Sequence, residues 1–407
     1  MAELKPFRAL RYKFNLLTNL ICPPYDVIDS EMRSRLCAMS KYNIVNIELP
    51  KSSTSYNPYQ QSLILLNSWI SNGILIKDSM ASLYFYEQIF EHNNIKMTRR
   101  GFFSLLKLDD HYIKQHEQII ESHKEDRLSL LQETKANISP IFVVFEDSNH
   151  IIINLCKEIS KKNPQSFARD SNGIFHKLWV VNNTDIINLV IEYFKKKVVF
   201  IADGHHRYNT ACEYRDKEIK IHQHTLSVNY ESNYILTYFC PMEDPGILIL
   251  PTHRVLLDIP HHLDDIITKY FDVHHTNRDY HKSLAKLNQS SNQAFMIFFH
   301  GRYKILTIKK RSFLKRFMPN KSESYRNLAV NILHNILVPN IEASKYVYCK
   351  NDKDALLFAQ KTGKMAIIFP SIPMQYLKNI SLSNEIMPQK TTYFYPKLAS
   401  GMVIRKF

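Results

Sequence analysis

Hydrophobic and polar positions follow two different periods along the chain, and together they predict a protein with both strands and helices. Short apolar runs rich in β-branched residues predict strands near 43–49, 82–90, 100–108, 140–146, 174–181, 196–202, 233–240, 294–299, 303–309 and 364–369. Apolar residues at helical spacing predict helices at about 57–71, 125–134, 150–161, 184–195, 206–217, 323–336 and 352–361. Because the two kinds of element alternate, we expect a mixed α+β (α/β) fold rather than an all-β one.

The length of the chain, 407 residues, predicts more than one lobe. We expect an N-terminal α/β lobe at 1–195, a strand-turn-helix core at 196–259, an inserted or second lobe at 260–350, and a C-terminal segment at 351–407 that returns to the active site. The stretch 260–292 is polar and rich in His and Asn, which favours an insertion or a linker between lobes.

Two absences in the sequence bear on where the protein is found. No run approaches the roughly 18 apolar residues that a membrane span needs. The N-terminus also lacks the apolar region of a secretory signal. We therefore expect a cytoplasmic protein with no membrane as partner.

The composition narrows the possible cofactors and partners. The six cysteines are scattered without a Cys-x-x-Cys pair, which argues against disulfides and a structural zinc site. The chain has only 8 glycines, so neither a dinucleotide-binding fingerprint nor a Walker loop can form. The net charge of +15 is spread along the chain without a polybasic tail. We expect no NAD, no haem and no structural zinc, and the spread of charge argues against a nucleic-acid partner.

Residues 203–207, Asp-Gly-His-His-Arg, concentrate chemically capable side chains between a predicted strand and a predicted helix. Such a turn exposes the first amides of the helix and places Asp203 at the carboxyl end of the strand. A carboxylate there can activate a hydroxyl or hold a metal ion, the two histidines can transfer protons, and Arg207 can clamp phosphate oxygens. Gly204 is expected to meet a backbone requirement for positive φ or close approach. The alternative is that Asp203 only caps the helix and the histidines are solvated.

Other candidates are spread along the chain. Asp26, after paired prolines, is either a ligand-binding carboxylate or a turn residue. Glu117, Lys124 and Arg127 lie in a stretch dense in charge, which is a site segment or an exposed loop running into a helix. His253 follows an apolar strand and is a candidate phosphate or carboxylate contact. Lys390 belongs to a tail of hydroxyls, lysines and aromatics that either covers the site or packs on the surface.

Many of these residues belong to motifs that together resemble one family. The motifs are KPFRALRY, ICPPYDVI, NIVNIELP, RRGFFSLLKL, HEQ followed by KEDRL, ANISPIF, IADGHHRY, LPTHRV and MPQKTTYFYPKLASG. In this order they resemble domain of unknown function 1015, a bacterial and archaeal family, from end to end. That resemblance implies little established chemistry.

The Asp-Gly-His-His-Arg-Tyr turn is also similar to a motif of the ParB/sulfiredoxin-like superfamily, which includes free-serine kinases. This resemblance implies a ParB/sulfiredoxin-like core with large elaborations, and a turn that holds the phosphate donor. It implies that Asp203 is the general base or a possible Mg²⁺ ligand, that Glu117 is a second candidate base, and that the turn from Gly204 to Arg207 contacts the donor phosphates. The candidate catalytic residues are Asp203, His205, His206 and Glu117. The residues expected to bind phosphate or substrate are Gly204, Arg207, Tyr208, Asp26, Lys124, Arg127, His253 and Lys390.

The leading hypothesis from the sequence is therefore a small-molecule phosphotransferase, a kinase acting on a hydroxyl group. The acceptor is free serine or a similar hydroxy amino acid, and the donor is ATP, ADP or pyrophosphate with Mg²⁺. The alternatives are a phosphate-ester hydrolase using the same residues and a ParB-like DNA- or nucleotide-binding regulator. If one site exists, the 203–207 turn and the residues from the other segments should line a single cleft.

Overall fold

A computed structural model describes residues 2–51, 57–109, 111–117, 121–221, 230–259, 261–275, 278–340 and 345–407, with only the backbone for 121–123 and 275. The chain divides into two compact units. Unit 1 consists of Met1–Lys114, Ile119–Ile247 and Pro396–Phe407, and unit 2 of Gln115–Gln118 and Leu248–Tyr395. The prediction of a mixed α+β protein with more than one lobe is confirmed. The break at 247/248 lies inside the segment 196–259, which we expected to stay together.

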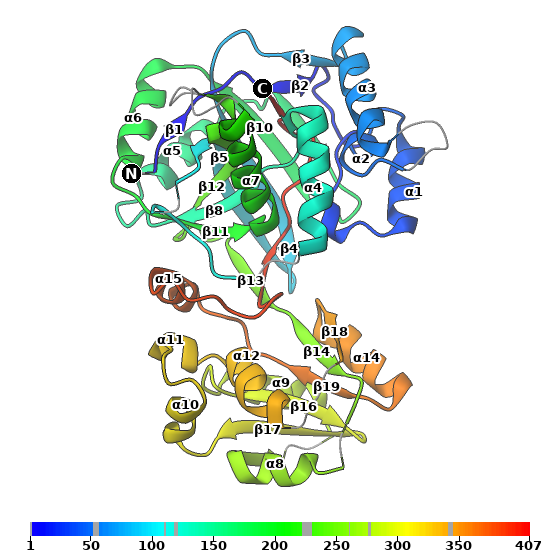
Figure 1. Ribbon diagram of the computed structural model, residues 1–407, viewed down its shortest axis with the longest axis vertical. Coiled ribbons are helices and arrows are strands. Elements are labelled where there is room, and N and C mark those ends of the chain that lie inside the picture. Colours follow the sequence, from blue (N-terminus) through cyan, green and yellow to red (C-terminus); the bar gives the residue numbers. More distant parts are fainter. Residues whose placement is uncertain are drawn as a thin grey trace. The chain divides into compact units, whose positions relative to one another are not determined.

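Unit 1 contains the predicted strand-turn-helix segment (Figure 1). Its elements are β1 Leu4–Lys5, β2 Leu10–Tyr12, η1 Tyr25–Val27, α1 Ser30–Met39, α2 Val45–Glu48, α3 Pro58–Ser71, β3 Leu75–Lys77, β4 Leu83–His92, β5 Ile95–Lys107, β6 Ile113–Lys114, α4 Glu121–Thr134, β7 Ala136–Asn137, β8 Ile141–Phe145, α5 Ile151–Ser160, β9 Ser166–Arg169, β10 Phe175–Val181, α6 Thr184–Phe194, β11 Val199–Asp203, α7 His205–Ile221, η2 Glu231–Asn233, β12 Tyr234–Pro241 and β21 Arg405–Lys406.

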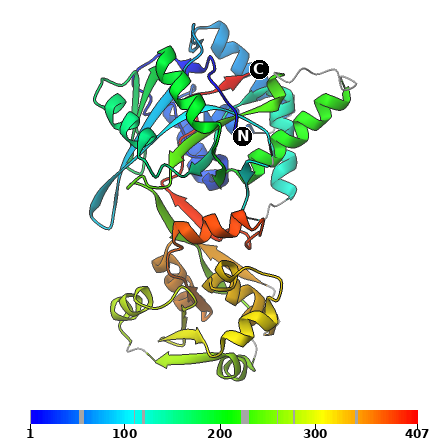
Figure 2. The same ribbon diagram turned by 90° about the vertical axis from the view of Figure 1, so that its left-hand side faces the viewer.

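A large mixed sheet forms the centre of unit 1. Among the described residues it has nine strands, in the order β6-β11-β8-β12-β5-β4-β10-β9, with β1 beside β5. The longest pair, β4 and β5, is a hairpin turning at Asn93 and Asn94, which both adopt positive φ, as a tight hairpin turn requires (Figure 2). β11 runs parallel to β6 and antiparallel to β8. This sheet carries the predicted site segment near one edge.

The apolar residues of unit 1 pack helices onto this sheet. Val190 and Phe194 of α6 belong to a fully buried cluster with Phe102 and Phe239 of the central strands. α5 and α7 contribute to the same cluster. The stripe predicted at 57–71 is α3, whose N-terminal Asn57 side chain accepts a hydrogen bond from the Tyr59 amide.

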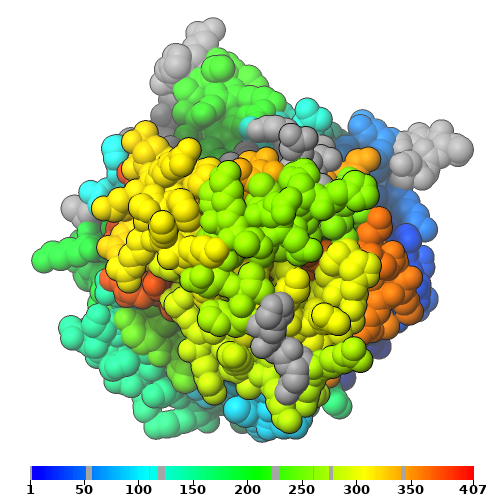
Figure 3. All heavy atoms as spheres, turned by 90° about the horizontal axis from the view of Figure 1, so that it is seen from below, coloured from blue at the N-terminus to red at the C-terminus, as the bar shows by residue number. Residues whose placement is uncertain are grey.

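Unit 2 is built around a second sheet. Within the described part of the chain its strand order is β15-β17-β16-β19-β14-β18, and every pairing is antiparallel. Its elements are β13 Leu248–Pro251, β14 His253–Leu256, α8 Leu263–Tyr270, β15 Phe271–His275, α9 Tyr280–Asn288, β16 Phe295–Phe299, β17 Arg302–Ile308, α10 Arg311–Phe317, α11 Glu323–Arg326, α12 Ala329–Ile332, η3 Leu333–Leu337, α13 Val338–Asn340, β18 Tyr346–Cys349, α14 Asp352–Thr362, β19 Met365–Ile368, α15 Met374–Leu382 and β20 Thr392–Tyr395. Figure 3 looks onto the face of unit 2 where α8 (yellow-green) lies.

Two sequence-based expectations about elements are wrong, and a third agrees with the structure in one of its two alternatives. Residues 43–49 contain the helix α2 rather than a strand, because Ile44, Val45 and Ile47 are all buried and leave no alternation of faces. The stretch 260–292, expected to be an insertion or a linker, forms α8, β15 and α9 of unit 2. It is therefore part of an insertion, since Leu248–Tyr395 lies between Ile247 and Pro396 of unit 1, and it is not a linker. The single helix expected at 323–336 is divided into α11, α12 and η3. No helix within the described ranges is long and apolar enough to cross a membrane.

Candidate functional site

The predicted strand-turn-helix is present at residues 199–221. β11 ends at Asp203, and α7 begins at His205, one turn residue later. The pairing of β11 with β8 shifts between Ile201 and Asp203, the kind of bulge that redirects a strand end beside a site. Gly204 between them has φ +93°, and a Cβ there would lie 3.0 Å from Ile141 Cγ2. Both backbone requirements expected of Gly204, positive φ and close approach, are confirmed.

Asp203 lies between two cations. Its Oδ2 accepts a hydrogen bond from Arg207 Nη2 at 2.7 Å, and its Oδ1 accepts one from Lys397 Nζ. Burial alone raises the pKa of a carboxyl group, but Lys397 and Arg207 outweigh it and lower the pKa of Asp203 to about 2. Asp203 is therefore ionised at every physiological pH. A carboxylate this acidic is a weak general base, so its charge supports a role in holding cations.

Arg207 serves the turn itself. Its Nη2 donates to Asp203, and its Nη1 donates to the Pro140 carbonyl. Burial lowers the pKa of Arg207, but Asp203, Tyr25, Asp26 and Glu48 together raise it above the ordinary value. Both terminal nitrogens have protein acceptors, so Arg207 links the turn to the residue before β8. The predicted role of Arg207 as a phosphate ligand stays a prediction.

Lys397 is the site residue that the sequence analysis missed. Two buried side chains of the β4–β5 hairpin hold its backbone: Arg99 donates to the Pro396 carbonyl at 2.6 Å, and Gln88 donates to the Lys397 carbonyl at 2.9 Å. Arg99 also donates to Gln88, its partner across the hairpin, and stacks over Phe142. The only sequence signal was the density of Lys and Thr in the tail. Lys397 is 194 residues from Asp203 in sequence, so no local pattern pairs them.

His205 and His206 occupy the first turn of α7. The Tyr208 amide bonds back to the Gly204 carbonyl at 2.9 Å, so the helical hydrogen bonds begin at the turn glycine. The positive end of a 17-residue helix therefore lies at His205, next to the Lys397–Asp203 pair. His205 is buried, whereas His206 is partly exposed. Imidazoles, an ammonium and helix amides here form an electropositive group suited to an anion.

The segment around the paired prolines approaches the same turn. Arg127 stacks over the Tyr25 ring at 4.3 Å. Burial raises the pKa of Tyr25 to about 12, with Arg207 opposing that change and Asp26 adding to it. Asp26 is itself exposed and close enough to raise the pKa of Arg207. The structure thus brings Asp26, Arg127 and the turn together within unit 1, as predicted, and adds Tyr25.

Three residues predicted to bind phosphate or substrate have contacts within the protein. Tyr208 is 1% exposed and belongs to the apolar cluster of unit 1. Lys124 Nζ pairs with Glu213 Oε2 at 2.9 Å and so ties α4 to α7. Arg127 is buried against Asp126 and the Glu48 carbonyl. Each of these side chains could bind a phosphate group, and each already contacts other residues of unit 1.

Glu117 and Lys390 meet in unit 2. Glu117 Oε1 accepts a hydrogen bond from the Lys390 amide at 2.6 Å, while Lys390 Nζ lies 5.3 Å from the centre of the Tyr348 ring. The Arg254 guanidinium also stacks over the Tyr348 ring, 4.5 Å from its centre. The role of Glu117 as a base stays a prediction. The single cleft likewise stays a prediction for Glu117, His253 and Lys390, which belong to unit 2.

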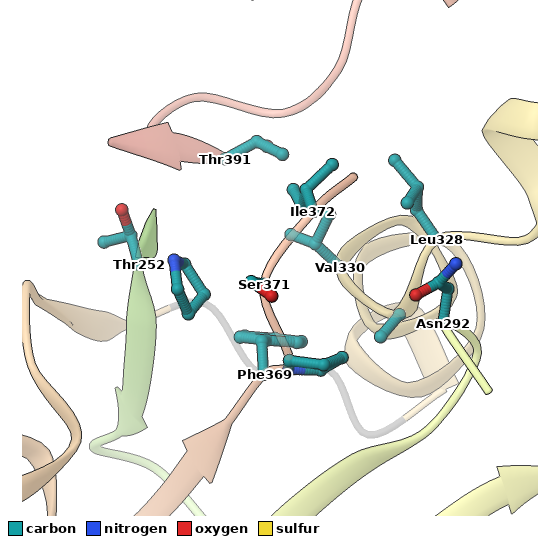
Figure 4. A pocket seen from close by; sticks show the side chains of 11 residues that line it. Thr252, Asn292, Leu328, Val330, Phe369, Ser371, Ile372 and Thr391 are labelled. Atoms are coloured by element: carbon teal, nitrogen blue, oxygen red, sulfur yellow. The ribbon is translucent and has the colours of Figure 1, made fainter. Parts of the chain in front are cut away.

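His253 has a hydrogen-bond partner within unit 2. It is buried, and its Nδ1 accepts a hydrogen bond from the Phe369 amide at 3.2 Å. Burial lowers the pKa of His253 to about 4, so the ring is neutral at pH 7. The neighbouring cavity in unit 2, lined by Thr252, Phe369, Ser371 and Thr391 among others, measures only about 10 Å³ and has room for at most one water (Figure 4).

Two imidazoles, the buried His253 and the half-buried His334, predict how the stability of unit 2 depends on pH. Burial lowers the pKa of both His253 and His334 to about 4, against about 6.5 in the unfolded chain. The unfolded state binds more protons between these values, so stability is full above pH 6.5 and is lost as the pH falls towards 4. For His253 the loss is roughly 3 kcal/mol.

Urea unfolding at pH 7 and pH 4.5, followed by circular dichroism, measures this loss, and the His253→Asn variant should lose less than the parent. Both tryptophans, Trp69 and Trp179, lie in unit 1, so their fluorescence is an internal reference for that unit. Equal losses in parent and variant would remove His253 as the cause.

The chain belongs to a known family. The model of the family described as "Protein of unknown function (DUF1015)" matches residues 4–333. This is a DUF1015 protein. A search of curated proteins finds no match. The motif-based resemblance to this family is therefore confirmed.

Solved structures similar to this DUF1015 protein include three of note. Free serine kinase in complex with AMP has 9% sequence identity and a TM-score of 0.38, covering 72% of this chain and 86% of that one. SbnI with C-terminal truncation from Staphylococcus aureus has 8% identity and a TM-score of 0.40, covering 74% and 86%. A conserved hypothetical protein from Pyrococcus furiosus has 12% identity and a TM-score of 0.36, covering 73% and 92%. TM-scores below 0.5 do not indicate a shared function.

The residues of the turn do not fit a protein-held Mg²⁺ ion. Within the described residues, no three His, Cys, Asp or Glu side chains gather closely enough to bind a metal. Asp203, the predicted ligand, is already neutralised by Lys397 and Arg207. Mg²⁺ prefers several oxygen ligands and often takes most of them from substrate phosphates and water. No step of the chemistry is therefore assigned to a metal held by Asp203.

Proposed function

We propose that this DUF1015 protein is a phosphotransferase that acts on the hydroxyl group of a small molecule, with the 203–207 turn as the site of the donor phosphates. The observation that carries the proposal is the convergence of Lys397, His205 and His206 on the positive end of α7, with Asp203 holding the ammonium in place. Phosphoryl transfer asks a protein mainly for positioning and for neutralisation of charge. The net charge of +15 also favours anionic substrates.

Each group has a distinct task in this proposal. Lys397 has three N–H donors, so it can hold Asp203 and a phosphate oxygen at once. The first amides of α7 and the two imidazoles donate to the remaining oxygens. Asp203 stays ionised and holds Lys397 and Arg207 in position by hydrogen bonds. Free serine or a similar hydroxy amino acid is the proposed acceptor, and ATP, ADP or pyrophosphate with Mg²⁺ is the proposed donor.

The test is a screen of the purified full chain. Hydroxy amino acids and simple alcohols are combined with ATP, ADP or pyrophosphate, with and without Mg²⁺, and phosphorus NMR detects a new phosphate monoester. We expect a product with at least one combination, formed at least about a hundredfold more slowly by the Asp203→Asn variant. Release of inorganic phosphate with no ester would instead support a hydrolase, and no reaction in any combination would refute the proposal.

A further inference from the structure

A small cavity in unit 1 lies beside the turn. It has a volume of about 40 Å³, enough for two or three waters. Helices α4 and α7 line it together with residues from α2, β12 and the stretch at 136–139. Its lining residues are Glu48, Arg127, Leu130, Leu131, Ala136, Asn137, Ile138, Ser139, Arg207, Thr210 and Ile235. Arg207 belongs to both the turn and this cavity, and so connects the two.

Three polar atoms of the lining have no hydrogen-bond partner within the part of the chain that the structure describes. They are Glu48 Oε2, Arg207 Nε and Thr210 Oγ1. Glu48 is 1% exposed and Thr210 is 2% exposed, so bulk water does not solvate them. A buried polar group without a partner is costly, and such groups in a folded protein usually receive a water or a ligand.

The remaining polar atoms around the cavity are fixed by the protein. Ser139 Oγ donates to Glu48 Oε1 at 2.8 Å, and Arg127 Nη1 lies 3.5 Å from the same oxygen. Arg207 uses both of its terminal nitrogens on Asp203 and on the Pro140 carbonyl. These contacts hold the carboxylate and the guanidinium still. They leave Oε2 of Glu48 as an acceptor and Nε of Arg207 as a donor.

The chemistry of these atoms selects a hydroxyl group. A hydroxyl donates one hydrogen bond and accepts two, which matches an acceptor at Glu48, a donor at Arg207 and the adaptable hydroxyl of Thr210. An ammonium group is disfavoured because two arginines line the same space. The apolar side of the cavity, from Leu130, Ile138 and Ile235, suits a methylene group.

We infer that this cavity binds the hydroxymethyl group of the acceptor substrate, a small primary alcohol. This inference rests on the proposed function for its link to catalysis, although the binding preference can be measured alone. It assigns Glu48 and Thr210 to recognition of the hydroxyl. Neither residue was a candidate from the sequence, because nothing local distinguishes a buried Glu or Thr with a partner from one without.

The experiment compares ligands that differ by one hydroxyl. Affinities of the full chain for L-serine and L-alanine, and for ethanolamine and ethylamine, are measured by calorimetry in the presence of pyrophosphate. We expect the parent to prefer the hydroxyl compound of each pair by at least about tenfold, because its buried polar atoms are otherwise unpaired. Glu48→Gln, which presents a donor where Oε2 accepted, and the isosteric Thr210→Val should each reduce that preference severalfold.

Thr134→Val is the matched control. Thr134 is a buried helical threonine in unit 1 whose Oγ1 already donates to the Leu130 carbonyl, and it does not line the cavity. Its substitution should leave the preference unchanged. Binding of pyrophosphate should be unaffected in Thr210→Val, which shows that the turn is intact.

The outcomes separate this inference from the proposed function. Loss of the hydroxyl preference in Glu48→Gln and Thr210→Val, but not in Thr134→Val, supports the cavity as the subsite. Phosphoryl transfer with an unchanged preference in both cavity variants overturns the inference and leaves the function standing. A preference that both variants abolish, without transfer to any acceptor, supports the subsite and refutes the function. Equal binding of both members of each pair by the parent shows that the cavity holds only water and overturns the inference.

Discussion

Replacing Asp203 with asparagine is expected to lower phosphoryl transfer by at least about a hundredfold, because the charge that positions Lys397 and Arg207 is lost. Asparagine keeps the size and one acceptor oxygen. It leaves two cations in a largely buried place without a counterion, so stability should fall as well. Steady-state rates by phosphorus NMR and urea unfolding measure the two effects separately.

Asp78→Asn is the control for the stability effect. Asp78 forms a bidentate pair with Arg11 in unit 1, and the exposure of its side chain, 16%, is close to the 17% of Asp203. A similar loss of stability with full turnover is expected for Asp78→Asn. If the two variants lose turnover equally, the Asp203 effect is a consequence of general destabilisation rather than of the site.

The low pKa of Asp203 also predicts how its contribution to folding stability depends on pH. Its folded pKa of about 2 lies below the unfolded value near 3.9, so its contribution to stability is complete above pH 4 and is lost as the pH falls towards 2. Between pH 5 and 9 Asp203 does not titrate. Any base that appears in the pH–rate profile over that range must therefore belong to another residue.

The Lys397→Met variant should raise the Kd for the phosphate donor by about tenfold or more, since the ammonium next to the positive end of α7 is removed. Asp203 would then keep Arg207 but lose its other ion-pair partner, and its pKa should rise towards the ordinary value. Lys397→Arg retains the charge and should recover part of the donor affinity. Donor titrations followed by calorimetry measure the change.

Lys406→Met provides the comparison on the same C-terminal segment. Lys406 Nζ donates to Asn67 Oδ1 at 2.6 Å, and this partly exposed lysine is not one of the two cations paired with Asp203. Its substitution removes one positive charge from the chain without changing the site. Unchanged donor affinity in Lys397→Met, or an equal loss in Lys406→Met, would mean that net charge rather than Lys397 binds the donor.

Much of the local structure could be predicted from the sequence. The strand, turn and helix around Gly204 follow from an apolar run, one glycine and the polar residues after it. These signals are local because backbone φ and side-chain periodicity depend on neighbouring residues. The strand predicted at 43–49 was wrong for the same reason. The apolar residues there are buried on every side of α2, so the sequence shows no period that distinguishes a helix from a strand.

The sequence by itself determined the chemistry available at the site and the family to which the chain belongs. It placed Asp203, His205 and His206 at the end of a strand, where their types predict phosphate chemistry. It could not decide which charges are already paired. Lys124 and Arg127 carry a positive charge as Lys397 does, yet the fold pairs the first two with Glu213 and Asp126 and pairs Lys397 with Asp203.

Only the tertiary structure decided those pairings, because each depends on how distant segments pack. The β4–β5 hairpin presents Arg99 and Gln88 to the backbone at 396–397, and this brings a lysine near the C-terminus to a turn in the middle of the chain. Burial made His253 neutral and left Glu48 with an unpaired oxygen, and neither effect has a local sequence signal. Residue types set what a site can do, whereas packing and desolvation select which residues do it.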